Sequence, residues 1–362
     1  MVRVERPAST AELAECLADA DRRGLAVLPR GGGRAMGMGG EPERTDLILE
    51  TGGLNRLLEL SSADLTLTVE AGIPLAELQG ELEKEGQFLP LDPYHEPGHS
   101  IGGVLASGWT GPLRLAYGGP RDYLLGLKVA LPDGRVTRSG GKVVKNVSGY
   151  DLKKLHLGAL GSLGVIVEAS FKVFPRPAAE VTLRWTGSEL GAALAEARRA
   201  LAAAQPPIAL VLESTPSDYL LSARLAGWPR AIGRMSAELG WEEIDPDFWR
   251  THQMAGSDAW ARISVPPARL DEVLPALPVG GWACSVGVGS VQWFAARQRE
   301  MVEDVRRRAE AAGGHLVLLQ AAPDLKQAVG PWGAMSSDPA LMASVRQAFD
   351  PNRTMAPGRF VV

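Results

Sequence analysis

The sequence predicts an α+β fold in two parts, with the boundary between them at Pro175-Arg176-Pro177. Near the start of the chain, a helical pattern precedes two short strand patterns, which is typical of a small α/β unit. From residue 65 onward, apolar residues alternate as they do in strands that are buried on one face. The two prolines cannot donate to a β ladder, so a sheet is expected to end there.

The first lobe of the first part covers about residues 1–55. Ser9-Thr10-Ala11-Glu12 is a capping box, which predicts the start of a helix that Gly24 ends. We expect strands at 25–29 and 46–50, with residues 30–40 forming a loop between them.

The second lobe covers about residues 56–177. Pro132-Asp133-Gly134 is a turn sequence, and strand patterns flank it on both sides. The pattern predicts strands at 65–69, 124–131, 135–138 and 165–174, and a helix at 73–85.

Residues 178–335 are expected to form a second α+β domain of the cap or substrate-binding type. Its pattern predicts helices at 188–204 and 302–312, and strands at 211–213, 222–225, 262–265 and 283–288. Tryptophans gather after residue 220, and we interpret them as core or as a partner surface. They are Trp228, Trp241, Trp249, Trp282 and Trp293.

Composition excludes several classes of function. The formal net charge of −4 offers no basic surface for nucleic acid. Two cysteines, Cys16 and Cys284, cannot hold an iron–sulfur cluster, which takes four thiolates. The first residues are charged, and no stretch reaches the ~18 apolar residues of a membrane span. We therefore expect a cytoplasmic protein with reduced cysteines and no transmembrane segment.

The first glycine cluster is Arg30-Gly31-Gly32-Gly33-Arg34-Ala35, directly after a strand. Successive glycines let backbone N–H groups converge on a pyrophosphate oxygen, and Arg34 could add a charge-assisted hydrogen bond. The loop fits neither the Gly-x-Gly-x-x-Gly pattern of Rossmann domains nor the phosphate loop of NTPases. The alternative is a loose hairpin tip.

Two further clusters follow. In the second, which runs from Pro93 to Gly108, Gly102-Gly103 would allow backbone to approach a flat ring; alternatively, Ser100 caps a helix. In the third, residues 158–164, spaced glycines would let the chain pass close to a ligand; alternatively, they only end a helix and start a strand.

Taken together, the ordered clusters resemble the FAD-binding module of the vanillyl-alcohol-oxidase-type flavoproteins, also called PCMH-type. The resemblance covers about residues 25–177 and implies a two-lobed FAD-binding domain over residues 1–177. Residues 139–152 and 171–177 narrow it to the FAD-binding second subunits of bacterial glycolate oxidases. Residues 349–359 resemble the family's closing segment, so residues 336–362 are expected to return to the FAD domain.

In the family, the first loop holds the pyrophosphate, the second segment lines the flavin, and the third runs beside the adenosine half. The resemblance therefore implies non-covalent FAD binding, because the His or Cys that tethers flavin in some relatives is missing. The implied cofactor-binding residues are Arg30, Gly31, Gly32, Gly33, Arg34, Ala35, Pro93, His99, Ser100, Ile101, Gly102, Gly103, Ser107, Gly108, Gly158, Gly161, Ser162, Gly164 and Val165.

Three positions depart from the family pattern. Arg34-Ala35 stands where a small hydroxyl residue is usual, Leu160 replaces a Glu, and Ala356 replaces an Asn. The five histidines are scattered, with His99 the one expected nearest the flavin. The sequence assigns no catalytic residue and no metal site.

The resemblance implies a FAD-binding subunit of a glycolate (2-hydroxy acid) oxidase complex that supports oxidation of glycolate to glyoxylate. The expected partners are a catalytic flavin subunit and an iron–sulfur subunit, which receives the electrons and could link the chain to the inner membrane. Two alternatives stay open. One is a self-sufficient FAD-dependent oxidoreductase with an unrecognised substrate, and the other is a scaffold subunit that has lost its flavin.

Overall fold

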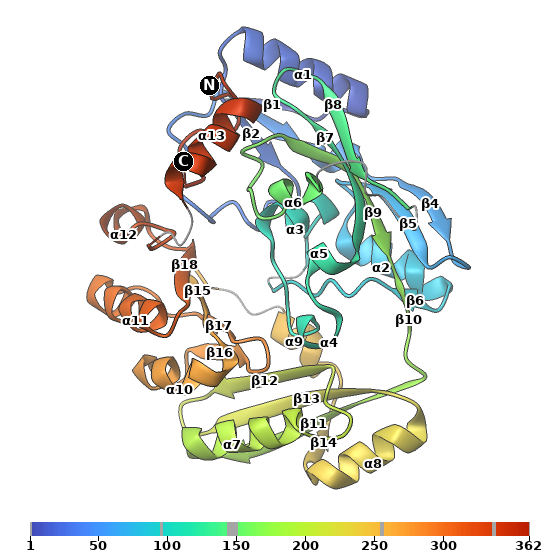
Figure 1. The fold of residues 1–362 in the computed structure, drawn as a ribbon, viewed down its shortest axis with the longest axis vertical. Coiled ribbons are helices and arrows are strands. Elements are labelled where there is room, and N and C mark those ends of the chain that lie inside the picture. The colour runs from blue at the N-terminus through green and yellow to red at the C-terminus, as the bar shows by residue number, and fades with distance from the viewer. Residues whose placement is uncertain (1, 95–96, 143–150, 254–256, 335–337, 362) are drawn as a thin grey trace. The chain divides into compact units, whose positions relative to one another are not determined.

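A computed structural model describes residues 2–94, 97–142, 151–253, 257–334 and 338–361 (Figure 1). The chain divides into two compact units, each a mixture of helices and sheets, which confirms the predicted α+β fold. Unit 1 consists of Met1–Trp109, Gly119–Arg176 and Met335–Val362, and unit 2 of Thr110–Gly118 and Pro177–Ala334.

Segment 110–118 departs from the sequence-based division, which placed it in the first domain. It belongs to unit 2 because Leu115 packs against that unit's hydrophobic core. The contact is close: a Cβ on Gly287 would lie 2.5 Å from the Leu115 side chain and 3.0 Å from that of Leu201.

The first lobe of unit 1 is a three-stranded parallel sheet with one long helix. Its strands are β1 (Arg3–Glu5), β2 (Val27–Arg30) and β3 (Leu47–Glu50), in the order β1-β3-β2, and its helix is α1 (Thr10–Arg22). The Ser9 hydroxyl caps α1 by accepting a hydrogen bond from the Glu12 N–H at 3.2 Å. Leu13 and Leu17, one turn apart, are fully buried.

The second lobe is a five-stranded antiparallel sheet in the order β4-β5-β9-β7-β8. The strands are β4 (Leu57–Ser61), β5 (Thr66–Glu70), β7 (Leu124–Ala130), β8 (Val136–Gly140) and β9 (Val165–Lys172). Its helices are α2 (Leu75–Lys84), α3 (Ile101–Ser107), α5 (Pro120–Tyr123) and α6 (Lys153–His156). A 3-10 turn occupies Thr51–Gly53.

The Pro-Arg-Pro segment separates two sheets, as expected from its missing N–H donors. β10 (Phe174–Pro175) pairs only with the two-residue strand β6 (Gln87–Phe88). Four residues later the chain starts β11 (Ala179–Gly187) in the sheet of unit 2.

Unit 2 is an eight-stranded antiparallel sheet in the order β14-β11-β13-β12-β16-β17-β15-β18. Its other strands are β12 (Ala209–Ser214), β13 (Tyr219–Gly227), β14 (Glu242–Ile244), β15 (Trp260–Ser264), β16 (Trp282–Ser285), β17 (Ser290–Trp293) and β18 (His315–Gln320). Its helices are α4 (Arg114–Tyr117), α7 (Leu190–Leu201), α8 (Pro229–Leu239), α9 (Phe248–Gln253), α10 (Leu270–Val273), α11 (Arg299–Ala311) and α12 (Pro323–Val329), with 3-10 turns at Pro267–Arg269 and Leu274–Ala276.

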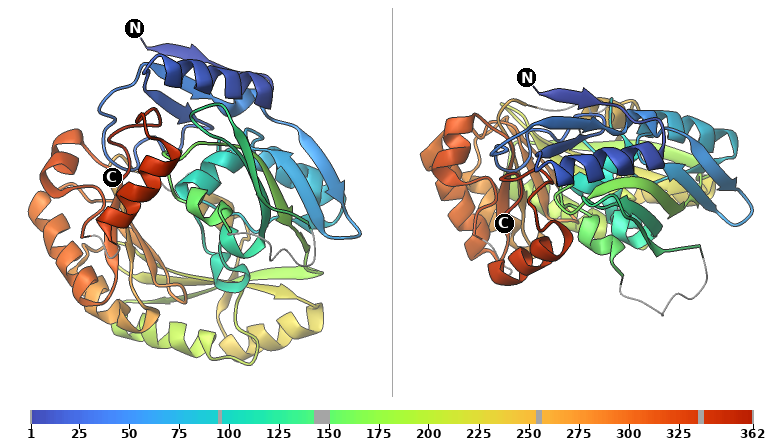
Figure 2. Two further views of the ribbon diagram at one scale, coloured as in Figure 1. Left: turned by 45° about the horizontal axis from the view of Figure 1, so that its top comes forward. Right: turned by 90° about the horizontal axis from the view of Figure 1, so that it is seen from above.

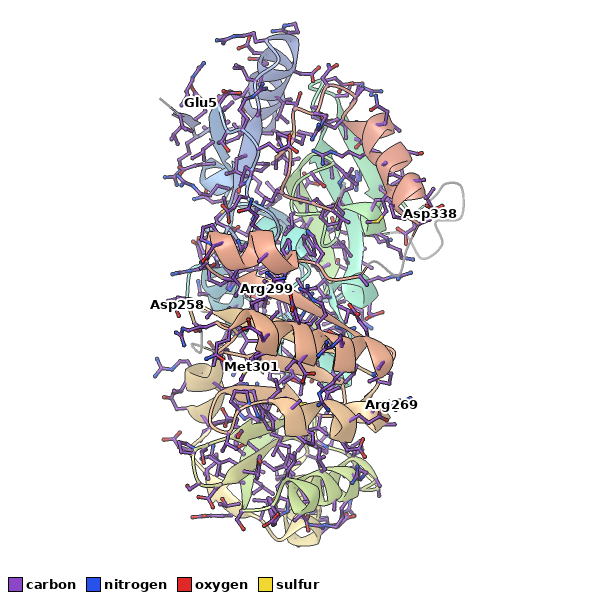
Figure 3. All side chains as sticks on the ribbon, turned by 90° about the vertical axis from the view of Figure 1, so that its left-hand side faces the viewer. Glu5, Asp258, Arg269, Arg299, Met301 and Asp338 are labelled. Atoms are coloured by element: carbon purple, nitrogen blue, oxygen red, sulfur yellow. The ribbon has the colours of Figure 1, made fainter. Side chains whose placement is uncertain are left out.

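The main core of unit 2 lies between one face of this sheet and helices α7, α8, α10 and α11 (Figure 2). Figure 3 labels Arg299 and Met301 at the start of α11. Trp282 and Trp293 are buried in this core, whereas Trp228 is 76% exposed. On the opposite face, Trp249 of α9 packs against Ala209, Val211 and Ala283, which alternate with core residues along their strands.

After α13 (Pro339–Phe349), whose N-cap Asp338 is labelled in Figure 3, the chain runs beside the first lobe. Val27 donates to the Thr354 carbonyl at 2.7 Å and accepts from the Ala356 N–H at 2.9 Å. Met355 is fully buried in the core of that lobe. The closing segment thus adds backbone pairing to β2.

Candidate functional site

A pocket of about 740 Å³, including space open to solvent, lies within unit 1 where the glycine clusters meet. The predicted residues that line it are Arg30, Gly31, Gly32, Gly33, Arg34, Ala35, His99, Ser100, Gly102, Gly103, Ser107, Gly161, Gly164 and Val165. Those that do not line it are Pro93, Ile101, Gly108, Gly158 and Ser162.

The predicted residues outside the pocket shape its walls instead. Ile101 is fully buried in the core, and Gly108 ends α3 in the left-handed region. Gly158 donates to the Leu105 carbonyl at 3.0 Å, and the Ser162 hydroxyl donates to Ala159 at 2.7 Å. Pro93 is also buried.

The first glycine loop packs closely against the second cluster, so the hairpin-tip interpretation is wrong. A Cβ on Gly31 would lie 2.2 Å from the Ser100 hydroxyl oxygen, and one on Gly32 would lie 1.7 Å from the Gly98 carbonyl oxygen. Gly33 has a φ of +77°, in the region that favours glycine. At Gly31 and Gly32 no side chain fits, so backbone atoms form this part of the pocket wall.

Ser100 joins the first two clusters through one hydroxyl. Its Oγ accepts hydrogen bonds from the N–H groups of Gly103 and Gly32, both at 3.2 Å. The first bond caps α3, which confirms the cap interpretation of this cluster, and Ser100 also lines the pocket.

The third cluster turns sharply beside the first loop. Gly161 and Gly164 have positive φ values of +76° and +138°, and a Cβ on Gly164 would lie 2.7 Å from the Ala130 carbonyl oxygen. Leu160 also has a positive φ, +52°, and donates its N–H to Ala106 at 2.8 Å. These glycines therefore serve both tight turns and the pocket wall.

The pocket lining is positively charged. It contains Arg30, Arg34 and Arg359 and, among the described residues, no Asp or Glu. Arg30 is paired with Glu50 at 2.5 Å, whereas Arg34 has no ion-pair partner in the described part of the chain and lies beside Gly98. Arg34 is thus the lining cation that is free to meet a phosphate group.

Arg359 was missed by the sequence reasoning, although the closing segment had been singled out. Its guanidinium group donates to the carbonyl oxygens of Ala35 at 2.5 Å and Met38 at 3.3 Å. Burial lowers its pKa to about 10, so it stays protonated at neutral pH. The closing segment therefore holds the first glycine loop in place.

Two histidines, His99 and His156, line the pocket. His99 is buried, with Nε2 2.8 Å from the Tyr94 carbonyl oxygen and its ring edge-on to Trp109 at 5.2 Å. His156, not predicted as a site residue, packs edge-on against Phe349 at 5.8 Å. Burial lowers the pKa of His156 to about 4, so its ring is neutral at physiological pH.

Within the described ranges, no three His, Cys, Asp or Glu side chains are grouped to hold a metal ion. Cys16 and Cys284 are both free thiols. In the same ranges, no helix combines the length and the apolar character that a membrane crossing requires.

Comparison with known proteins identifies the family. Residues 2–140 match a family model described as an FAD binding domain. The chain is 33% identical over 267 residues to the Escherichia coli (strain K12) protein named glycolate oxidase subunit GlcE, covering 72% of this chain and 73% of that one. This chain belongs to the same FAD-binding family.

A second curated relative and a solved structure are also similar to this chain. Glycolate oxidase subunit GlcD of Bacillus subtilis (strain 168) is 36% identical over 177 residues, covering 49% of this chain and only 38% of the relative. A solved alkyldihydroxyacetonephosphate synthase structure shares the fold, with a TM-score of 0.72 at 16% identity over 98% of this chain and 75% of that one.

The chain is therefore a member of an FAD-dependent oxidoreductase family, and FAD is its cofactor. The lining is compatible with this group, since it combines a glycine-rich backbone loop with Arg34, which has no ion-pair partner among the described residues. Which individual side chains contact FAD stays a prediction.

Proposed function

We propose that this chain is the FAD-binding subunit of a glycolate (2-hydroxy acid) oxidase or dehydrogenase complex. In this proposal the complex converts glycolate to glyoxylate, and an iron–sulfur subunit receives the electrons. The observation that supports it most is the 33% identity to a glycolate oxidase subunit over nearly three quarters of both chains.

Two features of the chain support a complex in which other subunits carry out catalysis and receive the electrons. Its FAD pocket has two lining histidines with other contacts: His99 is bonded to the Tyr94 carbonyl oxygen, and His156 packs against Phe349. Its two cysteines are too few for an iron–sulfur cluster, so a cluster that received the electrons would belong to another chain. A catalytic flavin subunit and an iron–sulfur subunit would supply what is missing.

The residues of this chain would bind and orient the cofactor. Bound FAD supplies the acceptor for the two electrons that leave a 2-hydroxy acid on oxidation. The N–H groups of Gly31 and Gly33 and the Arg34 guanidinium would hold the pyrophosphate, while the Gly32 N–H is bonded to Ser100. Arg359 would keep that loop in position through Ala35 and Met38. With no cysteine in either loop and no histidine in the first, FAD would be non-covalent.

The decisive experiment is a spectrum of the purified chain before and after FAD is added, followed by anaerobic glycolate. We expect a flavin spectrum, with all FAD released by acid precipitation, and no steady-state turnover by the chain alone. Co-expression with the catalytic flavin and iron–sulfur subunits should give a complex that oxidises glycolate.

Two results would overturn the proposal. Rapid glycolate turnover by the isolated chain would identify a self-sufficient oxidoreductase. A colourless protein after reconstitution with FAD would identify a subunit that has lost its flavin.

A further inference from the structure

Unit 2 contains a second polar site, centred on Arg262 in β15. Ala261 and Ile263 point into the helix-covered core, so Arg262 and its neighbours Trp260 and Ser264 lie on the opposite face of the sheet. Arg262 is directly opposite Gln292 of β17. On the other side, Ser264 is opposite His315 of β18, which brings His315 diagonally next to Arg262 on the same face.

No acidic side chain in the described part of the molecule neutralises this cluster. Arg262 is half-buried and forms neither an ion pair nor a hydrogen bond with any described residue. The charge that acts on it most is a second cation, Arg114 of α4, and together burial and Arg114 lower the pKa of Arg262 to about 10. Two cations held together without a counter-ion are costly unless an anion binds between them.

A buried amide beside Arg262 supplies a further donor. Gln292 is 3% exposed, and its Oε1 accepts a hydrogen bond from the Trp260 indole N–H at 3.0 Å. Because the amide oxygen faces Trp260, the amide nitrogen of Gln292 points away from Trp260. Among the described residues, its contact is a long one, 3.5 Å, to the Ser290 hydroxyl. The amide therefore keeps N–H capacity next to the guanidinium group.

We propose that Arg262, Arg114 and Gln292 form a binding site for the carboxylate group of a small 2-hydroxy acid. A guanidinium fork beside an amide N–H matches the two in-plane oxygens of a carboxylate. The choice of a 2-hydroxy acid rests on the proposed function, whereas the choice of a carboxylate rests on these side chains. The chain would then bring its own substrate-recognition site to the complex.

The test is isothermal titration of the FAD-loaded full chain with oxalate, a non-oxidisable carboxylate, and with glycolate. Arg262→Gln should weaken oxalate binding at least tenfold, and Arg262→Lys should recover only part of it. Arg114→Gln should weaken it less, because Arg114 is exposed. The matched control is Arg250→Gln in the same unit, since Arg250 is exposed and paired with Asp247; its affinity should equal the wild type's.

A second variant keeps the proposal testable if Arg262→Gln misfolds. Gln292→Glu places a carboxylate opposite Arg262, so it should abolish oxalate binding while raising the melting temperature. The proposal fails if the wild type binds no oxalate, if Arg262→Gln binds as tightly as the wild type, or if sulfate competes equally with oxalate. The flavin spectrum of each sample is read separately, so loss of FAD binding is distinguished from loss of the carboxylate site.

Discussion

Gly32 occupies a position in the first loop that admits no side chain. Its hypothetical Cβ would lie 1.7 Å from the Gly98 backbone carbonyl oxygen, which cannot rotate away. We expect Gly32→Ala to displace the loop and weaken FAD binding at least tenfold, measured by titrating the apoprotein with FAD. Gly80→Ala in α2 is the control, because that position is open and helical. Its FAD affinity should not change, and its stability should rise by up to about 1 kcal/mol. Unchanged binding in Gly32→Ala would show that the loop does not form the site.

His156 makes the protein sensitive to acid. Its folded-state pKa of about 4 lies below the ordinary value of 6.5 because the ring is buried. Above pH 6.5 the ring is neutral in both states, so it has no effect on the free energy of unfolding. Between pH 6.5 and 4 only the unfolded state takes up the proton, and stability falls by as much as about 3 kcal/mol.

His156→Phe should remove this loss. The measurement is the urea midpoint of the apoprotein at pH 7 and at pH 5. The wild type should lose more stability between the two than the variant does; equal losses would contradict the assigned burial effect.

Two of the positions that depart from the family pattern have an unusual backbone conformation. Ala356, where the family pattern leads us to expect Asn, has a φ of +41°, and Leu160, where it leads us to expect Glu, has a φ of +52°. Asn tolerates this region better than other non-glycine residues do. The sequence reveals which residues differ, but only backbone geometry shows that these two sit in strained conformations.

At the scale of single elements, α3 is the one whose cap also serves the pocket. Ser100→Ala removes the acceptor for two N–H groups, those of Gly103 and Gly32. We expect a stability loss of about 1 kcal/mol for the cap, together with weaker FAD binding. Ser9→Ala is the control, because Ser9 caps α1 with the same 3.2 Å bond but does not line the pocket. It should lower stability alone; an equal loss of FAD affinity in both variants would contradict the dual role of Ser100.

Elements with a local signal could be predicted, and elements held by distant pairing could not. The capping box at Ser9 predicted α1 to within a residue of its start, and alternation predicted β5 and β9. β18 was missed because its residues 315–320 form an unbroken apolar run between His315 and Gln320. Its place in the sheet depends on pairing with β15, about fifty residues earlier in the chain, which no local pattern records.

At the scale of the whole molecule, the C-terminal segment of unit 1 hydrogen-bonds to the first glycine loop. Arg359→Met removes the donors to Ala35 and Met38, and we expect FAD binding to weaken about tenfold, measured by the same titration. The control is Arg353→Met, which removes an exposed pair with Glu43 from the same segment. Because exposed pairs contribute little, its affinity should stay within about twofold of the wild type's. Similar losses in the two variants would assign the effect to the segment as a whole.

Sites formed by residues that are far apart in the chain were the hardest to predict from the sequence. The resemblance to known flavoproteins brought the glycine clusters together, because their order along the chain carries the information. It gave no sign that 110–118 belongs to unit 2, since that depends on the packing of Leu115 against the hydrophobic core of that unit. The Arg262 cluster likewise joins residues from four separate elements, β15, β17, β18 and α4. Their grouping is therefore not visible in the order of residues along the chain.

The pairing of Val27 with residues 354–356 has a consequence for the order in which the protein is made. A ribosome produces the first glycine loop early, then all of the main segment of unit 2, and only afterwards Met355 and Arg359. Until then, the first lobe has neither residues 354–356, which pair with β2, nor Arg359, which holds the first glycine loop. Cofactor loading is thus a late event in biogenesis, and a chain that stalls before residue 359 carries an incomplete pocket.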